Sequence, residues 1–213
     1  MDNVDYILNK FNLNFDDKTR MPIEIRDFDR EGMASLFQEL GFKIGAEIGV
    51  RGGGYSAILC RAIPGVRLYG VDPYVPHKGY LDHTRKSTFD KFHEEAKARL
   101  APYENYHFIE KFSLDAVKDF ANNSFDFVYI DGNHDFYNVT ADITFWSEKV
   151  RPGGIISGDD FFKHKGPSRI HVYQVVKALA VAYSIRPWFV LGADETVPGE
   201  KRDSGRSWMW VKQ

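Results

Sequence analysis

Apolar residues recur along this chain with two different spacings. In roughly the first 40 residues they lie three and four positions apart, as Val4, Ile7 and Phe11 do, which is typical of helices that bury one face. From Lys43 onward, short apolar runs alternate with further helical patterns. The runs occupy residues 44–50, 67–71, 106–109, 125–130 and 155–157. Strands that alternate with helices predict a parallel sheet that is covered on both faces.

The end of the chain follows a different order. Residues 168–183 have a helical pattern, and two apolar runs follow, 188–191 and 207–211, with a polar stretch between them. Because no helix fits between these runs, they predict an antiparallel hairpin. The predicted fold is therefore α/β: a doubly wound, seven-stranded sheet with a parallel core, a C-terminal hairpin and helices on both faces. We expect residues 1–40 to form a helical appendage and residues 41–213 the main domain.

Composition and charge exclude several function classes. With 213 residues, 43% of them hydrophobic, the chain resembles folded proteins rather than disordered or fibrous ones. The formal net charge of −2 argues against a nucleic-acid partner, which needs a basic face. A single cysteine, Cys60, excludes an intramolecular disulfide and a cysteine-built zinc site. The longest apolar stretch is too short to span a membrane, and the acidic start lacks the layout of a signal peptide, so we expect a cytoplasmic protein without a membrane partner.

The first predicted strand runs into a glycine-rich segment that begins at Gly49. Glycines allow a tight turn and a close approach to a ligand, beside the free N–H groups of a following helix. The dinucleotide fingerprint G-x-G-x-x-G fails here because Arg51 stands at the second glycine. Glu47, at the strand end, would repel a pyrophosphate and suits a ligand that carries positive charge. A simple turn from strand to helix would explain these glycines equally well.

Polar residues also follow the second and third predicted strands. Asp72 lies about 20 residues after Gly53, the offset at which an acid meets ribose hydroxyls in nucleotide sites. An aspartate that caps a helix or forms a turn is the alternative. Ser113, after the third strand, is a candidate either to cap the next helix or to bond an adenine edge.

Three aspartates follow the fourth and fifth predicted strands. Asp131 ends one strand, and Asp159 and Asp160 end its expected neighbour, so the three carboxylates should meet at one rim. Clustered carboxylates repel one another unless something positive intervenes, and hard oxygen ligands favour Mg²⁺, Ca²⁺ or Mn²⁺. His134 follows closely and can take up a proton near neutral pH. Helix capping and a solvated aspartate pair are the alternative.

These segments together resemble a known group. Glu47-Ile48-Gly49-Val50, Gly70-Val71-Asp72 and the run from Tyr129 to His134 are similar to the class I S-adenosylmethionine-dependent methyltransferases, which have a Rossmann-like fold. The pairing of Ile130-Asp131-Gly132-Asn133-His134 with Gly158-Asp159-Asp160 resembles the metal-dependent sugar O-methyltransferases of macrolide and aminocoumarin biosynthesis. The resemblance covers residues 43–212.

The resemblance implies a role for each residue. The cofactor, S-adenosylmethionine, would contact Glu47, Gly49, Gly53, Tyr55, Ser56, Asp72, Ser113 and Asp131. Within this set Glu47 and the glycines would hold the methionine end, and Tyr55 or Ser56 would lie near its carboxylate. Asp72 would bind the ribose and Ser113 would lie by the adenine.

The same resemblance implies the reaction. Asp131, Asp159 and Asp160 would ligate Mg²⁺ or another hard divalent cation, and His134 would be the general base. Some relatives have an acidic base two residues after the first metal ligand, where this chain has Asn133. The expected activity is O-methyl transfer to a hydroxyl of a sugar or other small diol, and the acceptor is expected to be a small molecule.

Other functions stay open. A non-catalytic cofactor-binding protein of the same fold would not need His134 and the aspartates. A nicotinamide-dependent dehydrogenase disagrees with the failed fingerprint, and a metal-dependent hydrolase leaves Asp72 unexplained. The N-terminal helices are candidates for an active-site cap or for the contact of a homo-oligomer. Residues 74–87 are a candidate lid or a surface loop, and residues 163–166 a candidate contact for an anionic acceptor or a solvated loop.

Overall fold

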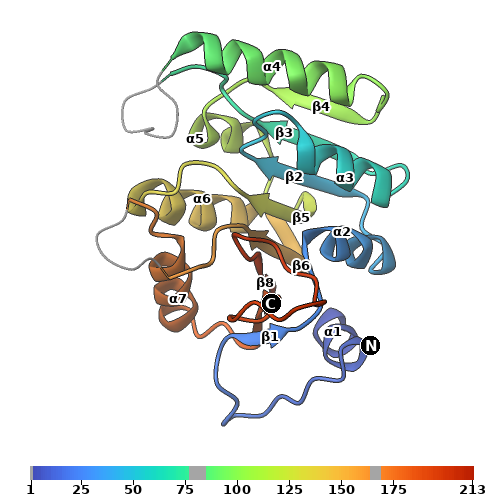
Figure 1. The fold of residues 1–213 in the computed structure, drawn as a ribbon, viewed down its shortest axis with the longest axis vertical. Coiled ribbons are helices and arrows are strands. Elements are labelled where there is room, and N and C mark those ends of the chain that lie inside the picture. Colours follow the sequence, from blue (N-terminus) through green and yellow to red (C-terminus); the bar gives the residue numbers. More distant parts are fainter. Residues whose placement is uncertain (1, 77–84, 164–168) are drawn as a thin grey trace.

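A single eight-stranded sheet runs through the protein, and helices cover both of its faces (Figure 1). The computed structural model describes residues 2–76, 85–163 and 169–213. Its strands are β1 (Ile23–Ile25), β2 (Ile44–Ile48), β3 (Arg67–Val71), β4 (Tyr106–Ile109), β5 (Phe125–Ile130), β6 (Val150–Gly158), β7 (Trp188–Leu191) and β8 (Trp208–Val211). Its helices are α1 (Asn3–Lys10), α2 (Arg30–Glu39), α3 (Gly54–Ala62), α4 (Lys86–Leu100), α5 (Ser113–Ala116), α6 (Phe136–Lys149) and α7 (Val172–Ala182), with a 3₁₀ turn at Val117–Asp119.

The strand order across the sheet is β1-β7-β8-β6-β5-β2-β3-β4. Neighbouring strands are parallel except where β8 pairs with β6 and with β7. The predicted parallel core and the C-terminal antiparallel hairpin are therefore confirmed. From β2 the chain winds outward to β3 and β4 and then returns to β5 on the other side of β2 (Figure 1). This reversal is the position at which doubly wound sheets bind ligands.

The register brings the carboxyl ends of the central strands level. Ile48 lies opposite both Val71 of β3 and Ile130 of β5, and Ile130 lies opposite Gly158 of β6. The residues that directly follow these four strands must therefore meet at one edge of the sheet. This register places Asp72, Asp131, Asp159 and Asp160 at that edge.

The sequence pattern predicted seven strands, and the eighth is β1, which lies within the first 40 residues. It pairs in parallel with β7, with Ile23 opposite Phe189. Three residues are too few to show the alternation by which a strand is recognised in a sequence. The helices of this segment are packed as well, because Ile7 of α1 and Phe37 of α2 are fully buried. The N-terminal segment therefore extends the sheet and contributes to its core.

The sheet separates two hydrophobic cores. Helices α1 to α4 cover one of them, where the rings of Phe37 and Phe127 stack with their centres 4.4 Å apart. Helices α5 to α7 cover the other, around Trp146 and Trp208. No helix of the described residues is long and apolar enough to cross a bilayer. Most of the candidate lid, residues 77–84, and residues 164–166 of the second loop lie outside the described residues.

Arg206 joins the strands at the β1 edge. It lies two residues before the start of β8 and is only 3% exposed. Its guanidinium donates to Glu24 of β1 at 2.6 Å and to Asp194 at 2.8 Å. It also donates to the main-chain oxygens of Leu191 and Gly192, at the end of β7. One side chain thus satisfies buried carbonyl groups and links β1 to the hairpin.

Replacing Arg206 should weaken this edge. We expect Arg206→Met to lower the free energy of unfolding by about 1–3 kcal/mol, because the carbonyls of Leu191 and Gly192 would lose their donor. The matched control is Arg26→Met, which removes an exposed ion pair with Glu200 and should change stability by less than about 0.5 kcal/mol. Urea unfolding followed by circular dichroism measures both, and equal effects of the two substitutions would contradict the structural role of Arg206.

Candidate functional site

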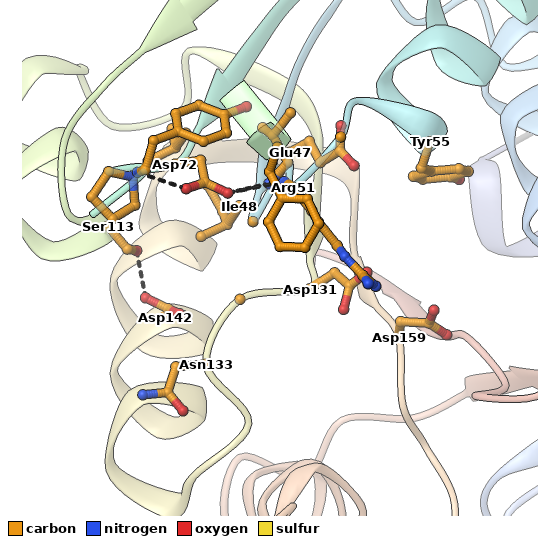
Figure 2. A pocket seen from close by; sticks show the side chains of 18 of the residues that line it. Glu47, Ile48, Arg51, Tyr55, Asp72, Ser113, Asp131, Asn133, Asp142 and Asp159 are labelled. Atoms are coloured by element: carbon orange, nitrogen blue, oxygen red, sulfur yellow. Dashed lines mark hydrogen bonds between the residues drawn. The ribbon is translucent and has the colours of Figure 1, made fainter. Parts of the chain in front are cut away.

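A cavity of about 820 Å³ lies where the central strands end. Its walls are formed by the residues that follow β2, β3, β5 and β6, together with the segment after β4 and the start of α2. All of the predicted site residues line this cavity except Gly53 and Ser56, which lie behind its wall. Figure 2 shows Glu47, Asp131 and Asp159 on one side of the cavity and Asp72 and Ser113 on the other.

The glycine-rich turn brings two strand ends close together. Gly49 has a φ of +91°, and a Cβ at this position would overlap the carbonyl oxygen of Asp131. Only glycine allows both the dihedral angle and the approach. Gly53 also has a positive φ, of +71°, and its Cβ would meet Leu100 of α4 at 2.8 Å. Gly49 therefore shapes the cavity itself, whereas Gly53 allows α4 to pack behind the turn.

Glu47 is almost fully buried, with 2% of its surface exposed. Its carboxylate accepts a hydrogen bond from the hydroxyl of Ser56. Burial raises the pKa of Glu47 from its ordinary value near 4.5 to about 8, since a low-dielectric surrounding disfavours the charged form. A cationic group placed beside Glu47 would favour ionisation again. Ser56 thus acts on the cavity through Glu47.

Asp72 ties the end of β3 to the glycine-rich turn. Its Oδ2 accepts from the main-chain N–H groups of Val50 at 3.1 Å and Arg51 at 2.9 Å, and its Oδ1 accepts from that of Tyr74 at 2.9 Å. Burial raises the pKa of Asp72, and these three donors oppose the increase. A carboxylate oxygen can accept two hydrogen bonds, so Oδ1 retains capacity for a ribose hydroxyl.

Ser113 belongs to a buried polar chain that the sequence did not reveal. Its hydroxyl accepts from the indole nitrogen of Trp146 at 2.8 Å and donates to Asp142 (Figure 2). Its side chain makes no cap for α5. Asp142 is 4% exposed and lines the cavity, and burial raises its pKa to about 7. The sequence did contain one sign that Asp142 is buried: it lies on the apolar stripe of α6, between Val139 and Trp146.

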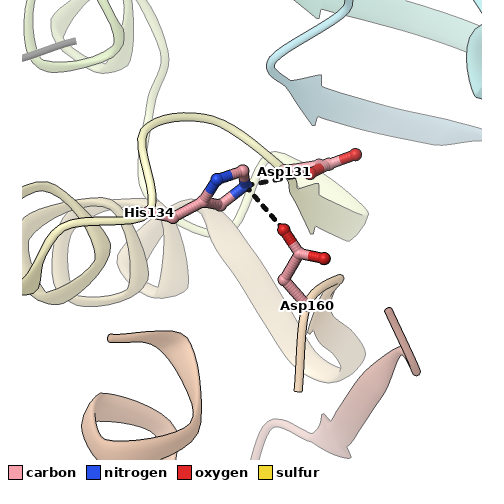
Figure 3. Close-up of side chains that lie close together, drawn as sticks. All are labelled: Asp131, His134 and Asp160. Carbon is pink, nitrogen blue, oxygen red and sulfur yellow. Dashed lines mark hydrogen bonds and ion pairs between the residues drawn. The ribbon is translucent and has the colours of Figure 1, made fainter. Parts of the chain in front are cut away.

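Asp131, His134 and Asp160 form a close cluster at the other end of the cavity (Figure 3). The Nε2 atom of His134 lies 3.3 Å from Oδ1 of Asp131 and 3.1 Å from Oδ2 of Asp160. Asp131 directly follows β5, His134 stands before α6, and Asp160 lies just beyond β6. The adjacent strand ends therefore bring together two of the three predicted carboxylates and the predicted base.

Asp159, the third predicted carboxylate, faces the guanidinium of Arg30. Its Oδ2 lies 3.4 Å from Nη1 of Arg30, and its Oδ1 accepts from the Ser207 hydroxyl at 3.4 Å. Burial, together with the nearby charges of Asp131 and Asp160, raises the pKa of Asp159 to about 7. Arg30 opposes this increase. Asp159 thus lines the same cavity as the cluster but is turned toward Arg30.

The residues around Asp159 and Asp160 fit a divalent cation. A Cβ at Gly205 would lie 2.6 Å from Oδ1 of Asp160 and 3.0 Å from Oδ1 of Asp159, so a glycine at this position leaves space beside both carboxylates. Carboxylate oxygens are the ligands that Mg²⁺ and Mn²⁺ prefer. The carboxylates are therefore suited to a hard divalent ion.

Arg30 is the second cavity residue that sequence reasoning missed. It is the first residue of α2, and its main-chain N–H donates to Asp203 at 2.7 Å. Its guanidinium lies 5.5 Å from the centre of the Tyr55 ring, and the Tyr55 hydroxyl donates to its main-chain oxygen at 3.1 Å. No pattern in the first 40 residues distinguishes this arginine from a solvated one. The N-terminal segment thus contributes directly to the site.

Known proteins match this chain in sequence family and in fold. A family model described as a methyltransferase domain matches residues 46–161. An O-methyltransferase from Bacillus cereus, solved in complex with S-adenosylhomocysteine, has a similar fold (TM-score 0.61, 19% identity, 86% of this chain and 80% of that chain covered). So does the O-methyltransferase TomG from Streptomyces achromogenes, involved in tomaymycin synthesis and solved with S-adenosylmethionine (TM-score 0.60, 20% identity, 86% and 79% covered). No curated protein matches the sequence.

The buried acid Glu47 should give the stability of the protein a defined pH dependence. Because the pKa of Glu47 is raised to about 8, the folded state keeps a proton that the unfolded chain releases above about pH 4.5. Stability should therefore fall as the pH rises from about 5 to 8. We expect Glu47→Gln, which cannot ionise, to remove up to about 1.4 kcal/mol per pH unit of this slope.

Urea unfolding at pH 5, 6, 7 and 8 measures this effect. The control is Glu94→Gln, on the exposed side of α4, which should leave the slope unchanged. A slope that is the same in wild type and Glu47→Gln would show that Glu47 does not retain its proton in the folded protein.

Proposed function

The chain belongs to the methyltransferase-domain family, and we propose that it transfers the methyl group of S-adenosylmethionine to a hydroxyl oxygen of a small acceptor. The observation that carries the proposal is that one cavity of about 820 Å³ contains both a nucleoside-type end and an acid–base end. Asp72 and Ser113 lie at the first and the cluster of Asp131, His134 and Asp160 at the second. The crystallised O-methyltransferases with the same fold, bound to this cofactor or its product, support the assignment.

The cofactor side of the cavity fits S-adenosylmethionine in shape and charge. This cofactor supplies a methyl carbon that its sulfonium group makes electrophilic. Glu47 and Asp131 would place negative charge near its cationic groups, and Gly49 allows the backbone to approach it closely. Asp72 would accept from the ribose hydroxyls through Oδ1, and Ser113 would border the adenine.

The acidic side of the cavity suits a divalent cation and an acceptor with two neighbouring oxygens. When bound, such a cation lowers the pKa of a hydroxyl and fixes its direction. Asp131 and Asp160 would hold it together with Asp159, for which Gly205 leaves space. Two adjacent oxygens on the acceptor would complete the ligand set, and for this reason we favour a sugar or another small diol as substrate.

His134 is the proposed general base. Its Nε2 lies within 3.3 Å of both Asp131 and Asp160, so an acceptor hydroxyl brought to these carboxylates is also brought to this nitrogen. His134 would accept the hydroxyl proton at Nε2 while the oxygen bonds to the methyl carbon, the bond from this carbon to sulfur breaks, and S-adenosylhomocysteine leaves. The two carboxylates would then stabilise the imidazolium that forms. Holding the acceptor in line with the methyl carbon supplies much of the remaining acceleration.

The proposal is tested by methyl transfer itself. We expect the purified protein with Mg²⁺ to move label from methyl-labelled S-adenosylmethionine to a member of a panel of catechols and glycosides. Analogues in which one of the two oxygens is replaced by hydrogen should be inert. His134→Ala should lower kcat by about 10²–10⁴-fold and leave the Kd of S-adenosylhomocysteine unchanged, whereas His107→Ala, on the exposed side of β4, should be fully active. Unchanged turnover in His134→Ala would remove this residue from the role of base.

The metal site is tested separately by calorimetry. After treatment with EDTA, the protein should bind Mg²⁺ or Mn²⁺ in the presence of S-adenosylhomocysteine. The double variant Asp131→Asn/Asp160→Asn should weaken this binding by at least about tenfold, since each carboxylate supplies a charged oxygen ligand. Asp115→Asn, on an exposed aspartate paired with Lys118, is the control. Metal binding that survives in the double variant would place the ion elsewhere.

A further inference from the structure

The methionine end of the cavity presents a problem of charge. The cofactor carries a carboxylate as well as an ammonium group, yet Glu47, Asp131 and Asp159, which line this part of the wall, are acids. The resemblance assigned this carboxylate to Tyr55 or Ser56. The single hydroxyl proton of each is already used, because Ser56 donates to Glu47 and Tyr55 donates to the main-chain oxygen of Arg30. A further side chain would be needed to offer this carboxylate a positive charge.

Three arginines among the described residues line the cavity: Arg30, Arg51 and Arg99. Arg99 reaches across to the carbonyl of Gly52 and donates to it. Arg51 is exposed, and its guanidinium lies 4.9 Å from the ring centre of Phe92 on α4. Arg30 alone of the three stands beside Tyr55, where the charges of Glu47 and Asp131 act on it.

Arg30 is held in place before any ligand arrives. Asp203 accepts from its main-chain N–H and lies 3.6 Å from its Nε, and the Tyr55 ring supports its guanidinium. Its side-chain contacts are long, at 3.4 Å to Asp159 and 3.6 Å to Asp203, and no described residue accepts from its Nη2. A guanidinium with unused donors can bind a carboxylate through two parallel hydrogen bonds.

We propose that Arg30 binds the carboxylate of the methionine moiety of S-adenosylmethionine, an inference that rests on the proposed function. The cavity wall then matches both charges of the amino acid. Arg30 takes the carboxylate, and Glu47 and Asp131 take the ammonium group. Because Arg30 is the first residue of α2, the N-terminal segment would complete the cofactor site. The family match, by contrast, begins only at residue 46.

The test compares two ligands that differ only in the carboxylate. Calorimetry measures the Kd of S-adenosylhomocysteine and of its decarboxylated analogue for wild type, Arg30→Met, Arg30→Lys and Arg51→Met. We expect Arg30→Met to weaken S-adenosylhomocysteine about 10–100-fold, the worth of a hydrogen-bonded charge pair, and the analogue by less than about threefold. Arg30→Lys should recover part of the affinity for S-adenosylhomocysteine because it restores a point charge. Arg51→Met should change the two ligands equally.

Each other outcome has a definite meaning. Equal weakening of both ligands in Arg30→Met would overturn the inference, since a merely structural role affects them alike. A carboxylate-specific loss in Arg51→Met instead would also overturn it. If Arg30→Met does not fold, as judged by thermal unfolding, Arg30→Gln provides the same comparison with a neutral side chain that can still donate to Asp203. Failure of wild type to bind S-adenosylhomocysteine at all would refute the proposed function itself.

Discussion

The site depends on how closely the ends of β2 and β5 approach each other at Gly49. Any side chain at this position would overlap the carbonyl oxygen of Asp131. The same approach is held by a hydrogen bond of 2.7 Å from the N–H of Asp131 to the carbonyl of Ile48. Because the two strand ends touch, Glu47 and Asp131 face one cavity, and the chain that continues from β5 delivers His134 to the same place. The presence of the proposed cofactor-binding and acid–base residues in one cavity therefore follows from the backbone at one turn.

This closeness has an electrostatic cost that shapes the rest of the site. Several carboxyl groups share the cavity, and burial raises the pKa of Glu47 to about 8 and that of Asp159 to about 7. Buried charges without partners are strongly unfavourable. The chain offsets part of this repulsion with Arg30, and a cationic ligand would offset more. A cavity of this kind gains affinity for positive charge at the expense of its own stability, as functional sites commonly do.

The parts of the site that the sequence could predict are those fixed by the register of a parallel sheet. Asp72, Asp131 and Asp159 each follow a strand, so knowing the strands is enough to bring them to one edge. Arg30 and Asp142 could not be found in this way. Arg30 meets Asp159 across 129 positions of sequence, through the packing of α2, and Asp142 is reached only because α6 lies against α5. The short strand β1 could not be predicted for a related reason. Its pairing with β7 stabilises it, and its three residues show no recognisable pattern in the sequence.

The contributions to the site divide by their origin in the chain. The strand ends supply the side chains of Glu47, Asp72, Asp131 and Asp159, and these lie within the region that the family model matches. Outside that region, the start of α2 supplies Arg30, and the loop before β8 supplies Asp203, which holds Arg30, and Gly205, which leaves space beside Asp159 and Asp160. A fold shared at about one-fifth sequence identity fixes the strand ends but leaves such loops free to vary. The two flanking segments meet where Asp203 accepts from Arg30, beside Asp159. This junction lies between the proposed methionine end and the proposed metal-binding carboxylates, and it is where this chain can differ from proteins with the same sheet.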